Sequence, residues 1–121
     1  MPKAGWLFLS VGQGVELAIS SSSVHRVLHG GSPEFGAYAA EAVNLAEYLG
    51  VESDPGLPSV IVVLQSGAAW LAGDASLQRE SEAVRYLSLR AGLLRRSPPW
   101  CRGIIEGGTR WAYVVEEAAI A

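Results

Sequence analysis

The first side chains in this sequence to consider for chemistry are those of its two histidines, His25 and His29. A spacing of four places two side chains on one face of a helix, which is how paired metal ligands are often presented. No cysteine lies nearby, and the segment around them is expected to be extended, where positions four apart are separated by more than ~10 Å at a rise of ~3.3 Å per residue. We therefore expect two surface histidines, with no metal and no cofactor.

The candidate nucleophiles and acids do not form a catalytic pattern. The serine run Ser20–Ser23 has no G-x-S-x-G elbow, and Gly12-Gln13-Gly14 lacks the third glycine and the lysine of a phosphate-binding loop. Asp74 has no second acid at a spacing that pairs with it, and nothing marks Cys101 as more than a half-buried thiol. The chain is therefore predicted not to be an enzyme.

The composition is that of one globular domain spanning residues 1–121, since half the residues are apolar and only 17% are charged. The single cysteine cannot form an internal disulfide and fits a reducing compartment. No stretch approaches the ~20 apolar residues of a membrane-spanning helix, and the N-terminal apolar run is too short for a signal peptide. We expect a cytoplasmic protein without membrane insertion, and the net charge of −3 argues against general nucleic-acid binding.

The chain is organised around residues 58–80. Val60–Leu64 is an unbroken run of β-branched and leucine residues, which predicts a strand covered on both faces. Ser66-Gly67 supplies a turn, and residues 68–74 are predicted to return as its antiparallel partner. A two-stranded ribbon this apolar is not stable alone, so other strands must cover it.

Short segments elsewhere are predicted to supply those strands. They are residues 6–11, 15–20, 82–89, 102–106 and 109–116, with glycine turns joining the first two and the last two. In residues 15–20 apolar and polar side chains alternate, which predicts one buried and one solvated face. Trp6, Trp70 and Trp111 lie within strands and are expected in the core. Roughly eight or nine short strands are typical of an all-β barrel or sandwich with minor helix.

Residues 32–49 allow two predictions. A serine–proline pair at 32–33 would start a helix, and apolar residues recur at helical spacing from 42 to 49. Alternatively, Asn44 with Glu47 would cap a much shorter helix at residues 45–49, which leaves residues 40–43 free to form a strand. Periodicity alone does not decide between the long helix and the strand.

Three segments resemble the CheW-like adaptor family of bacterial chemotaxis. Residues 43–51, VNLAEYLGV, are similar to the strand-then-helix segment that closes the family's first half. Residues 60–80, VIVVLQSGAAWLAGDASLQRE, resemble its central hairpin, and residues 98–120, PPWCRGIIEGGTRWAYVVEEAAI, resemble its closing hairpin with a short helix after it. Together these segments and the strands before them extend the likeness over most of residues 5–121.

The resemblance implies a pair of interleaved five-stranded β-barrels, the first mainly in residues 5–51 and the second mainly in residues 58–121. It also implies that Val43 lies in a strand. The implied function is that of a non-catalytic adaptor, which links a chemoreceptor and a CheA-type histidine kinase through protein–protein contacts. The stretch between Gly31 and Val43 is too short for the Arg-Gly hairpin of the family, and Arg26 stands where a glutamate is usual. The chain therefore resembles a diverged, shortened member.

Protein partners are expected to bind strand edges and loops of the first barrel. The candidate contact residues there and on one loop are Val24, Arg26, Val27, Leu28, Val43 and Trp100. Trp100 follows a diproline, where an exposed aromatic side chain would serve as a contact residue. The same tryptophan with nearby arginines suggests an alternative, a small barrel that binds single-stranded nucleic acid. That alternative ranks second because the aromatic residues are few and most are needed inside.

Overall fold

The computed structural model describes residues 5–52, 59–79, 84–88, 99–107 and 110–120. The strands in this part of the chain are β1 (Gly5–Gly12), β2 (Val15–Ser20), β3 (Val24–His29), β4 (Val43–Asn44), β5 (Val60–Leu64), β6 (Ala69–Ala72), β7 (Asp74–Arg79), β8 (Val84–Ser88), β9 (Cys101–Gly107) and β10 (Arg110–Val115). The helices are α1 (Pro33–Ala39) and α2 (Leu45–Leu49), with short 3-10 turns η1 (Ser21–Ser23) and η2 (Glu117–Ala119). The expected mostly β chain with minor helix is confirmed.

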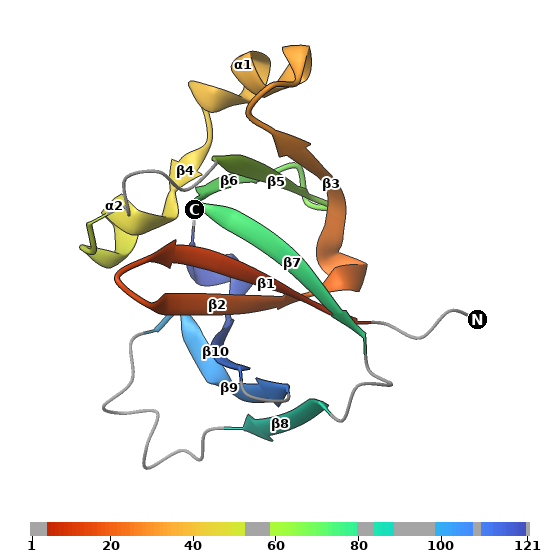
Figure 1. Cartoon of the computed structure of the whole chain (residues 1–121), viewed down its shortest axis with the longest axis vertical. Coiled ribbons are helices and arrows are strands. Elements are labelled where there is room, and N and C mark those ends of the chain that lie inside the picture. The colour runs from red at the N-terminus through yellow and green to blue at the C-terminus, as the bar shows by residue number, and fades with distance from the viewer. Residues whose placement is uncertain (1–4, 53–58, 80–83, 89–98, 108–109, 121) are drawn as a thin grey trace.

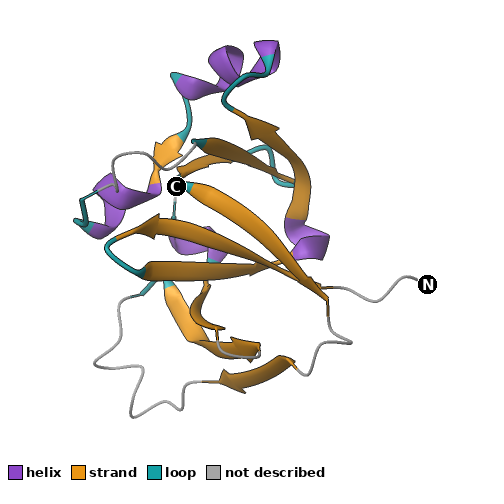
Figure 2. Ribbon diagram, viewed as in Figure 1, coloured by secondary structure: helices purple, strands orange, loops and turns teal. Residues whose placement is uncertain are grey.

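The strands form two sheets that face each other. One has six strands in the order β7-β1-β2-β10-β9-β8, and the other has four in the order β3-β5-β6-β4. Figure 1 shows β3 and α1 in the upper part of the molecule and β8 and β9 at the bottom, with β1, β2 and β7 between them. Strands dominate the described chain, and the helical segments are short (Figure 2).

Both predicted apolar hairpins are present. Strand β1 pairs antiparallel with β2, and β5 pairs antiparallel with β6. The β1–β2 turn contains Gln13 with φ 53° between two glycines of positive φ, Gly12 and Gly14. Because positive φ is costly for most residues with a side chain, the glycines on either side permit this tight reversal.

The strand after the central hairpin was not predicted. Residues 68–74 were expected as one return strand, but β6 ends at Ala72 and the chain enters the six-stranded sheet as β7, paired with β1. Gly73 is the single residue between the two strands, and its N–H donates a 2.8 Å hydrogen bond to the carbonyl of Ser10 in β1. A second connection between the sheets is η1, where Ser23 accepts a 2.8 Å hydrogen bond from the N–H of Gln65.

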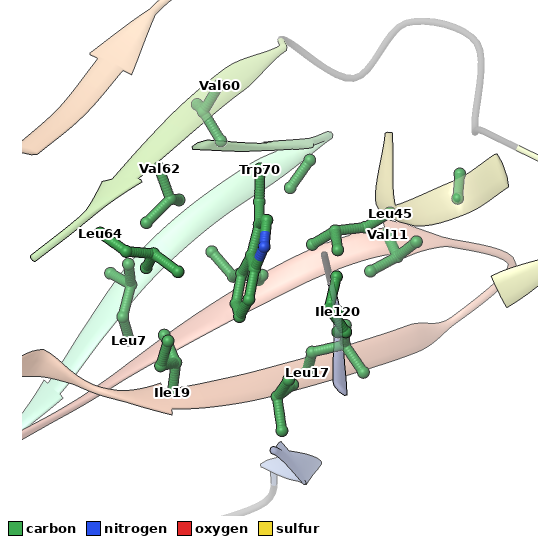
Figure 3. Packing of buried hydrophobic residues seen from close by; sticks show 14 residues of the cluster. Leu7, Val11, Leu17, Ile19, Leu45, Val60, Val62, Leu64, Trp70 and Ile120 are labelled. Carbon is green, nitrogen blue, oxygen red and sulfur yellow. The ribbon is translucent and has the colours of Figure 1, made fainter. Parts of the chain in front are cut away.

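The main core lies between the two sheets (Figure 3). Trp70 points from β6 into this space and is fully buried, with Leu45 and Val11 on one side and Val62 on the other. The buried members are Leu7, Leu9, Val11, Leu17, Ile19, Leu45, Ala46, Val60, Val62, Leu64, Trp70, Ala72, Val115 and Ile120. Residues from near both ends of the chain share this cluster, so the described strands pack as one unit.

The second face of several strands is also buried, which corrects one expectation. Residues 15–20 were expected to have a solvated face, but Ala18 on that face is fully buried with Phe8 of β1 and Val114 of β10. Register explains the cluster, since Ala18 is the partner of both Phe8 and Val114 in the sheet. A strand in the interior of a twisted sheet can therefore have both faces buried even where its sequence alternates.

Residues 32–49 combine parts of both predictions. Ser32 caps α1 by accepting a hydrogen bond from the N–H of Glu34 at 3.3 Å, but this helix ends at Ala39 rather than continuing. Asn44 then caps α2 in the same way, with its Oδ1 accepting from the N–H of Glu47 at 3.3 Å. Val43 lies in the two-residue strand β4, paired parallel with β6, so its placement in a strand is confirmed.

The prediction for the tryptophans is right for Trp70 and wrong for Trp111. Trp6 is partly buried against the Phe8 cluster, whereas Trp111 is 52% exposed on β10. Trp100, expected to be exposed, is partly buried against the main core. A period of two identifies the face on which a strand residue lies, but it does not say how far along the strand the covering layer extends.

The closing hairpin β9–β10 is present with the predicted antiparallel pairing, and β10 runs into the 3-10 turn η2 where a short helix was expected. The predicted strand at residues 82–89 appears as β8. The sequence also predicts loops at residues 52–58 and 90–99, and both lie mainly outside the described residues. Among the residues that are described, no helix is both long and apolar enough to cross a membrane.

Candidate functional site

The six predicted contact residues do not gather at one place. Val24, Arg26, Val27 and Leu28 lie on β3, at one edge of the four-stranded sheet, whereas Val43 lies on β4 at the opposite edge. Trp100 precedes β9 of the other sheet. The predicted contact residues therefore lie at three separate places: on β3, on β4 and in the turn before β9.

The outer edge of β3 is open among the described strands. On one side β3 pairs with β5 from Val24 to His29, and in the described part of the chain no strand pairs with its other side. A register shift between Val24 and Arg26 leaves His25 without a partner in the ladder, which is a β-bulge. An open edge presents backbone N–H and C=O groups to solvent and can be extended by a strand of another chain, although a bulge and charged side chains limit unselective pairing.

The apolar side chains of β3 pack in the interior of the protein. Val24 and Val27 are partly buried against the main core. Leu28 is 4% exposed and packs on the other side of the sheet against Ile61 and Val63. The side chain of Leu28 is thus not available to a partner, and at that position only the backbone could make a contact.

The polar side chains of β3 form its exposed part. Arg26 makes an ion pair with Glu34 in α1, and both side chains are partly exposed. Phe35 and Tyr38 of the same helix pack on the outer face of the sheet, so the ion pair and these two rings hold α1 beside β3. An ion pair this exposed contributes about 0–1 kcal/mol, so its main effect is to position the Arg26 guanidinium.

The two histidines flank this arginine. His25 and His29 are both exposed on the extended strand β3, as expected from the sequence. Within the described residues, no group of three or more His, Cys, Asp or Glu side chains is placed to hold a metal ion. The exposed surface of β3, which we call the β3 edge, is therefore made of His25, Arg26, His29 and the backbone between them.

A second exposed feature is a row of aromatic rings on and beside β10, of which only Trp100 was predicted as a contact residue. Trp111 contacts Tyr113 edge to face, with ring centroids 5.2 Å apart and an interplanar angle of 80°. Tyr113 contacts Trp100 in the same manner at 6.0 Å and 88°. We call Trp100, Tyr113 and Trp111 the aromatic row. The i, i+2 spacing of Tyr113 and Trp111 was visible in the sequence, but the exposure of Trp111 was not.

Charged residues of both signs lie beside the aromatic row, and Arg85 of β8 is the cross-strand partner of Glu106. Glu106 of β9 is the cross-strand partner of Trp111 and is exposed. Glu116 follows β10, and its carboxylate lies 3.5 Å from Nε of Arg102. The N–H of Glu116 also donates a 2.5 Å hydrogen bond to the carbonyl of Trp100, which ties the end of β10 to the residue before β9.

Cys101 and Asp74 carry no sign of reactivity. Cys101 is buried at the start of β9, and its thiol donates a 3.6 Å hydrogen bond to the carbonyl of Gly103. Burial raises the pKa of the Cys101 thiol, so at neutral pH the side chain is protonated and a poor nucleophile. Asp74 is exposed at the start of β7.

No protein-family model matches this chain, and comparisons with curated proteins and with solved structures give no match. The β3 edge and the aromatic row are therefore the features from which a function can be inferred.

Proposed function

We propose that this protein is a non-catalytic adaptor of the CheW-like kind, which links a chemoreceptor and a CheA-type histidine kinase in the cytoplasm. The observation that carries the proposal is the β3 edge, where Glu34 holds Arg26 and no described strand pairs with the outer side of β3. Strand edges of this type bind partners through main-chain hydrogen bonds, with nearby side chains supplying specificity.

The arrangement of the strands supports the fold that this function requires. Strands β6 and β7 are joined through Gly73, and β2 continues into β3 through η1, so the chain passes between the two sheets at two corners around the Trp70 core. We propose that the strands form the two small barrels that the resemblance implies, the first mainly in residues 5–51 and the second mainly in residues 58–121, with strands shared between them. In this proposal β8, β9 and β10, which share the six-stranded sheet with β2, belong to the second barrel.

The test is binding to a CheA-type kinase from the same genome, measured by biolayer interferometry. We expect micromolar affinity for the wild type and about tenfold weaker binding for Arg26→Glu, because reversal of a contact charge opposes association. The variant Glu34→Arg breaks the same ion pair and serves as a control for the position of α1.

The double variant Arg26→Glu with Glu34→Arg distinguishes a direct contact between Arg26 and the kinase from an effect of Arg26 on the stability of the protein itself. It restores an ion pair between β3 and α1 but leaves the wrong charge on β3, so binding should remain weak. Recovery of wild-type affinity in the double variant would show that Arg26 acts only within the protein. Absence of binding by the wild type would remove the kinase as partner.

The alternative of single-stranded nucleic acid binding has one feature in its favour, the exposed Trp111 ring. The described charges beside it argue against that function. Arg102 is already paired with Glu116, and the cross-strand partner of the Trp111 ring is the acidic Glu106. Nucleic-acid grooves instead surround their stacking rings with unpaired cations.

A further inference from the structure

A second apolar cluster lies on the outer face of the four-stranded sheet, on the side away from the Trp70 core. Its buried members, which we call the outer patch, are Leu28 of β3, Ile61 and Val63 of β5 and Ala69 of β6. The described residues that cover the outer patch from outside the sheet are Phe35 and Tyr38 of α1 and Ala42, which follows the helix. Figure 1 shows α1 at the top of the molecule, beyond β3 and β5 and away from β1 and β2.

Helix α1 has few features that hold it in place. It is seven residues long, and none of its residues is buried. Isolated helices shorter than ~12–15 residues are marginal in water, and Gly36 in the interior weakens this one further. The ion pair between Glu34 and Arg26 is exposed and contributes little. Segments with little buried apolar surface open at a lower free energy than the whole protein, so we expect α1 to leave the sheet without global unfolding.

The connections at both ends of α1 allow this movement. Two exposed glycines at residues 30–31 precede the helix, and a short turn leads from it to β4. The backbone hydrogen bonds at these ends are local, from the Ser32 N–H to the His29 carbonyl and from the Ala42 N–H to the Tyr38 carbonyl, both at 2.9 Å. Because each bond joins near neighbours in the chain, neither ties α1 to β5 or β6.

Release of α1 would expose the outer patch and separate a cation beside it from its partner. Arg26 is the cross-strand partner of Val63, a member of the outer patch, so this cation lies beside the apolar surface. With α1 in place, Glu34 pairs with Arg26 while Phe35 and Tyr38 cover the patch. The helix thus shows which chemistry this face takes: an acidic side chain, with apolar rings one and four residues after it.

We propose that α1 is an autoinhibitory lid, which a partner helix of the same chemistry displaces from the outer patch. Charge complementarity with Arg26 selects an acidic residue in the partner, and its apolar side chains, three residues apart, pack on Ile61 and Val63. The inference rests on the proposed function for the identity of the partner, because Arg26 is the contact residue proposed for the kinase. The opening of α1 does not depend on that identity and is tested separately.

The reactivity of two cysteine variants measures the opening. Val63→Cys replaces a side chain of the outer patch, whereas Val62→Cys replaces one that faces the Trp70 core on the same strand. Both are made in Cys101→Ala, and far-ultraviolet circular dichroism checks that they fold. We expect Ellman's reagent to label Val63→Cys at least tenfold faster than Val62→Cys. Low urea should accelerate only Val62→Cys, because release of α1 exposes far less surface than unfolding.

Two changes in α1 link opening to binding. Phe35→Ala removes a ring from the outer patch and should label Val63→Cys about five- to tenfold faster. Because apparent affinity scales with the fraction of protein in the competent state, Phe35→Ala should tighten kinase binding by the same factor. Glu34→Gln removes the competing carboxylate and should tighten it about twofold. Leu77→Ala changes an exposed residue of the other sheet and should leave the affinity unchanged.

A peptide tests the occupant without the kinase. The probe is a capped peptide with the sequence of residues 31–42, and in its control glutamine and alanine replace Glu34 and Phe35. In the Phe35→Ala protein, millimolar probe should slow labelling of Val63→Cys at least twofold, and the control peptide should not.

Three results would overturn the inference. These are equal labelling of the two cysteine variants at every urea concentration, no protection by the probe peptide, and kinase binding that Phe35→Ala weakens or leaves unchanged. If the wild type does not bind the kinase, the proposed function fails, and labelling with peptide protection still decides whether α1 is a displaceable lid.

Discussion

The N–H of Gly73 donates a 2.8 Å hydrogen bond to the carbonyl of Ser10, at the one residue between β6 and β7. This bond holds the chain where it leaves the four-stranded sheet and joins β1 of the six-stranded sheet. The Trp70 core lies between the sheets that Gly73 connects. The position of β7 therefore depends on a backbone donor rather than on a side chain.

Replacement of Gly73 by proline should destabilise the protein by about 2–3 kcal/mol, because proline has no N–H to donate to Ser10. Gly73→Ala keeps the donor and is the matched control, so it should cost less than the proline variant. Urea unfolding followed by tryptophan fluorescence gives both free energies. Equal stability of the two variants would contradict the role assigned to this hydrogen bond.

Replacement of Gly36 and of Gly50 by alanine should change the free energy of unfolding in opposite directions. Gly36 lies inside α1 with open space around the site of a Cβ, so Gly36→Ala should raise the free energy of unfolding by about 0.5–1 kcal/mol. Gly50 ends α2 with φ 73°, so Gly50→Ala should lower it by about 1–2 kcal/mol. Thermal melts monitored by circular dichroism test the signs, and a loss of stability in Gly36→Ala would show that α1 is held differently.

Trp70 has a buried indole N–H for which no hydrogen-bond partner exists among the described residues. Leaving such a donor unpaired costs about 1–3 kcal/mol, so Trp70→Phe removes a penalty while it opens a small cavity. We expect Trp70→Phe to cost less than about 2 kcal/mol and Trp70→Ala to cost about 3–5 kcal/mol. Similar unfolding free energies for the two variants in guanidinium titrations would contradict this account.

Cys101 should make stability depend on alkaline pH. Burial raises the pKa of its thiol above the ordinary value of 9.0, so the folded state keeps this proton at a pH where the unfolded state releases it. The stabilisation is complete below the unfolded pKa and is lost as the pH rises through the folded one. Cys101→Ala should therefore lose less stability than the wild type between about pH 8 and pH 10.

Urea midpoints measured across that range test the pH prediction. The comparison with Cys101→Ala removes the contributions of tyrosine and lysine, which titrate in the same range in both proteins. Parallel pH profiles would show that the thiol ionises equally in both states. Slow reaction of Cys101 with Ellman's reagent in the native protein, and fast reaction in urea, would support the burial directly.

The elements that were predicted correctly depend on neighbours in the sequence. The β1–β2 and β5–β6 hairpins follow from apolar runs joined by glycine-containing turns, and the caps at Ser32 and Asn44 follow from side chains that reach the backbone two or three residues on. Each of these signals acts over a few residues, so the sequence displays it directly.

Strand β7 and the exposure of Trp111 were missed for a different reason. Asp74–Arg79 has a weak strand pattern, and it becomes a strand because β1 offers an edge to pair with. Trp70 and Trp111 both lie at strand positions that face the core side, yet one is fully buried and the other is exposed. The difference depends on where the opposite sheet ends, which no local pattern records.

Among the candidate contact residues, too, local features were predicted correctly and contacts between distant segments were not. Arg26 was singled out from the sequence, but its partner Glu34 was not, because the ion pair joins a strand to the helix that folds back beside it. Leu28 was also a candidate contact, and it lies on the same face of β3 as Arg26, but it is buried with Ile61 and Val63 where Phe35 and Tyr38 of α1 pack on the sheet.

The sequence by itself determined that the chain is mostly β, where its main hairpins turn and where its short helices begin, because these depend on side-chain periodicity and on hydrogen bonds between near neighbours. Only the tertiary structure decided which strands share a sheet, that β7 crosses at Gly73 and that Trp111 remains exposed. These features arise from contacts between residues far apart in the chain, whose free energy depends on how far one sheet extends over the other.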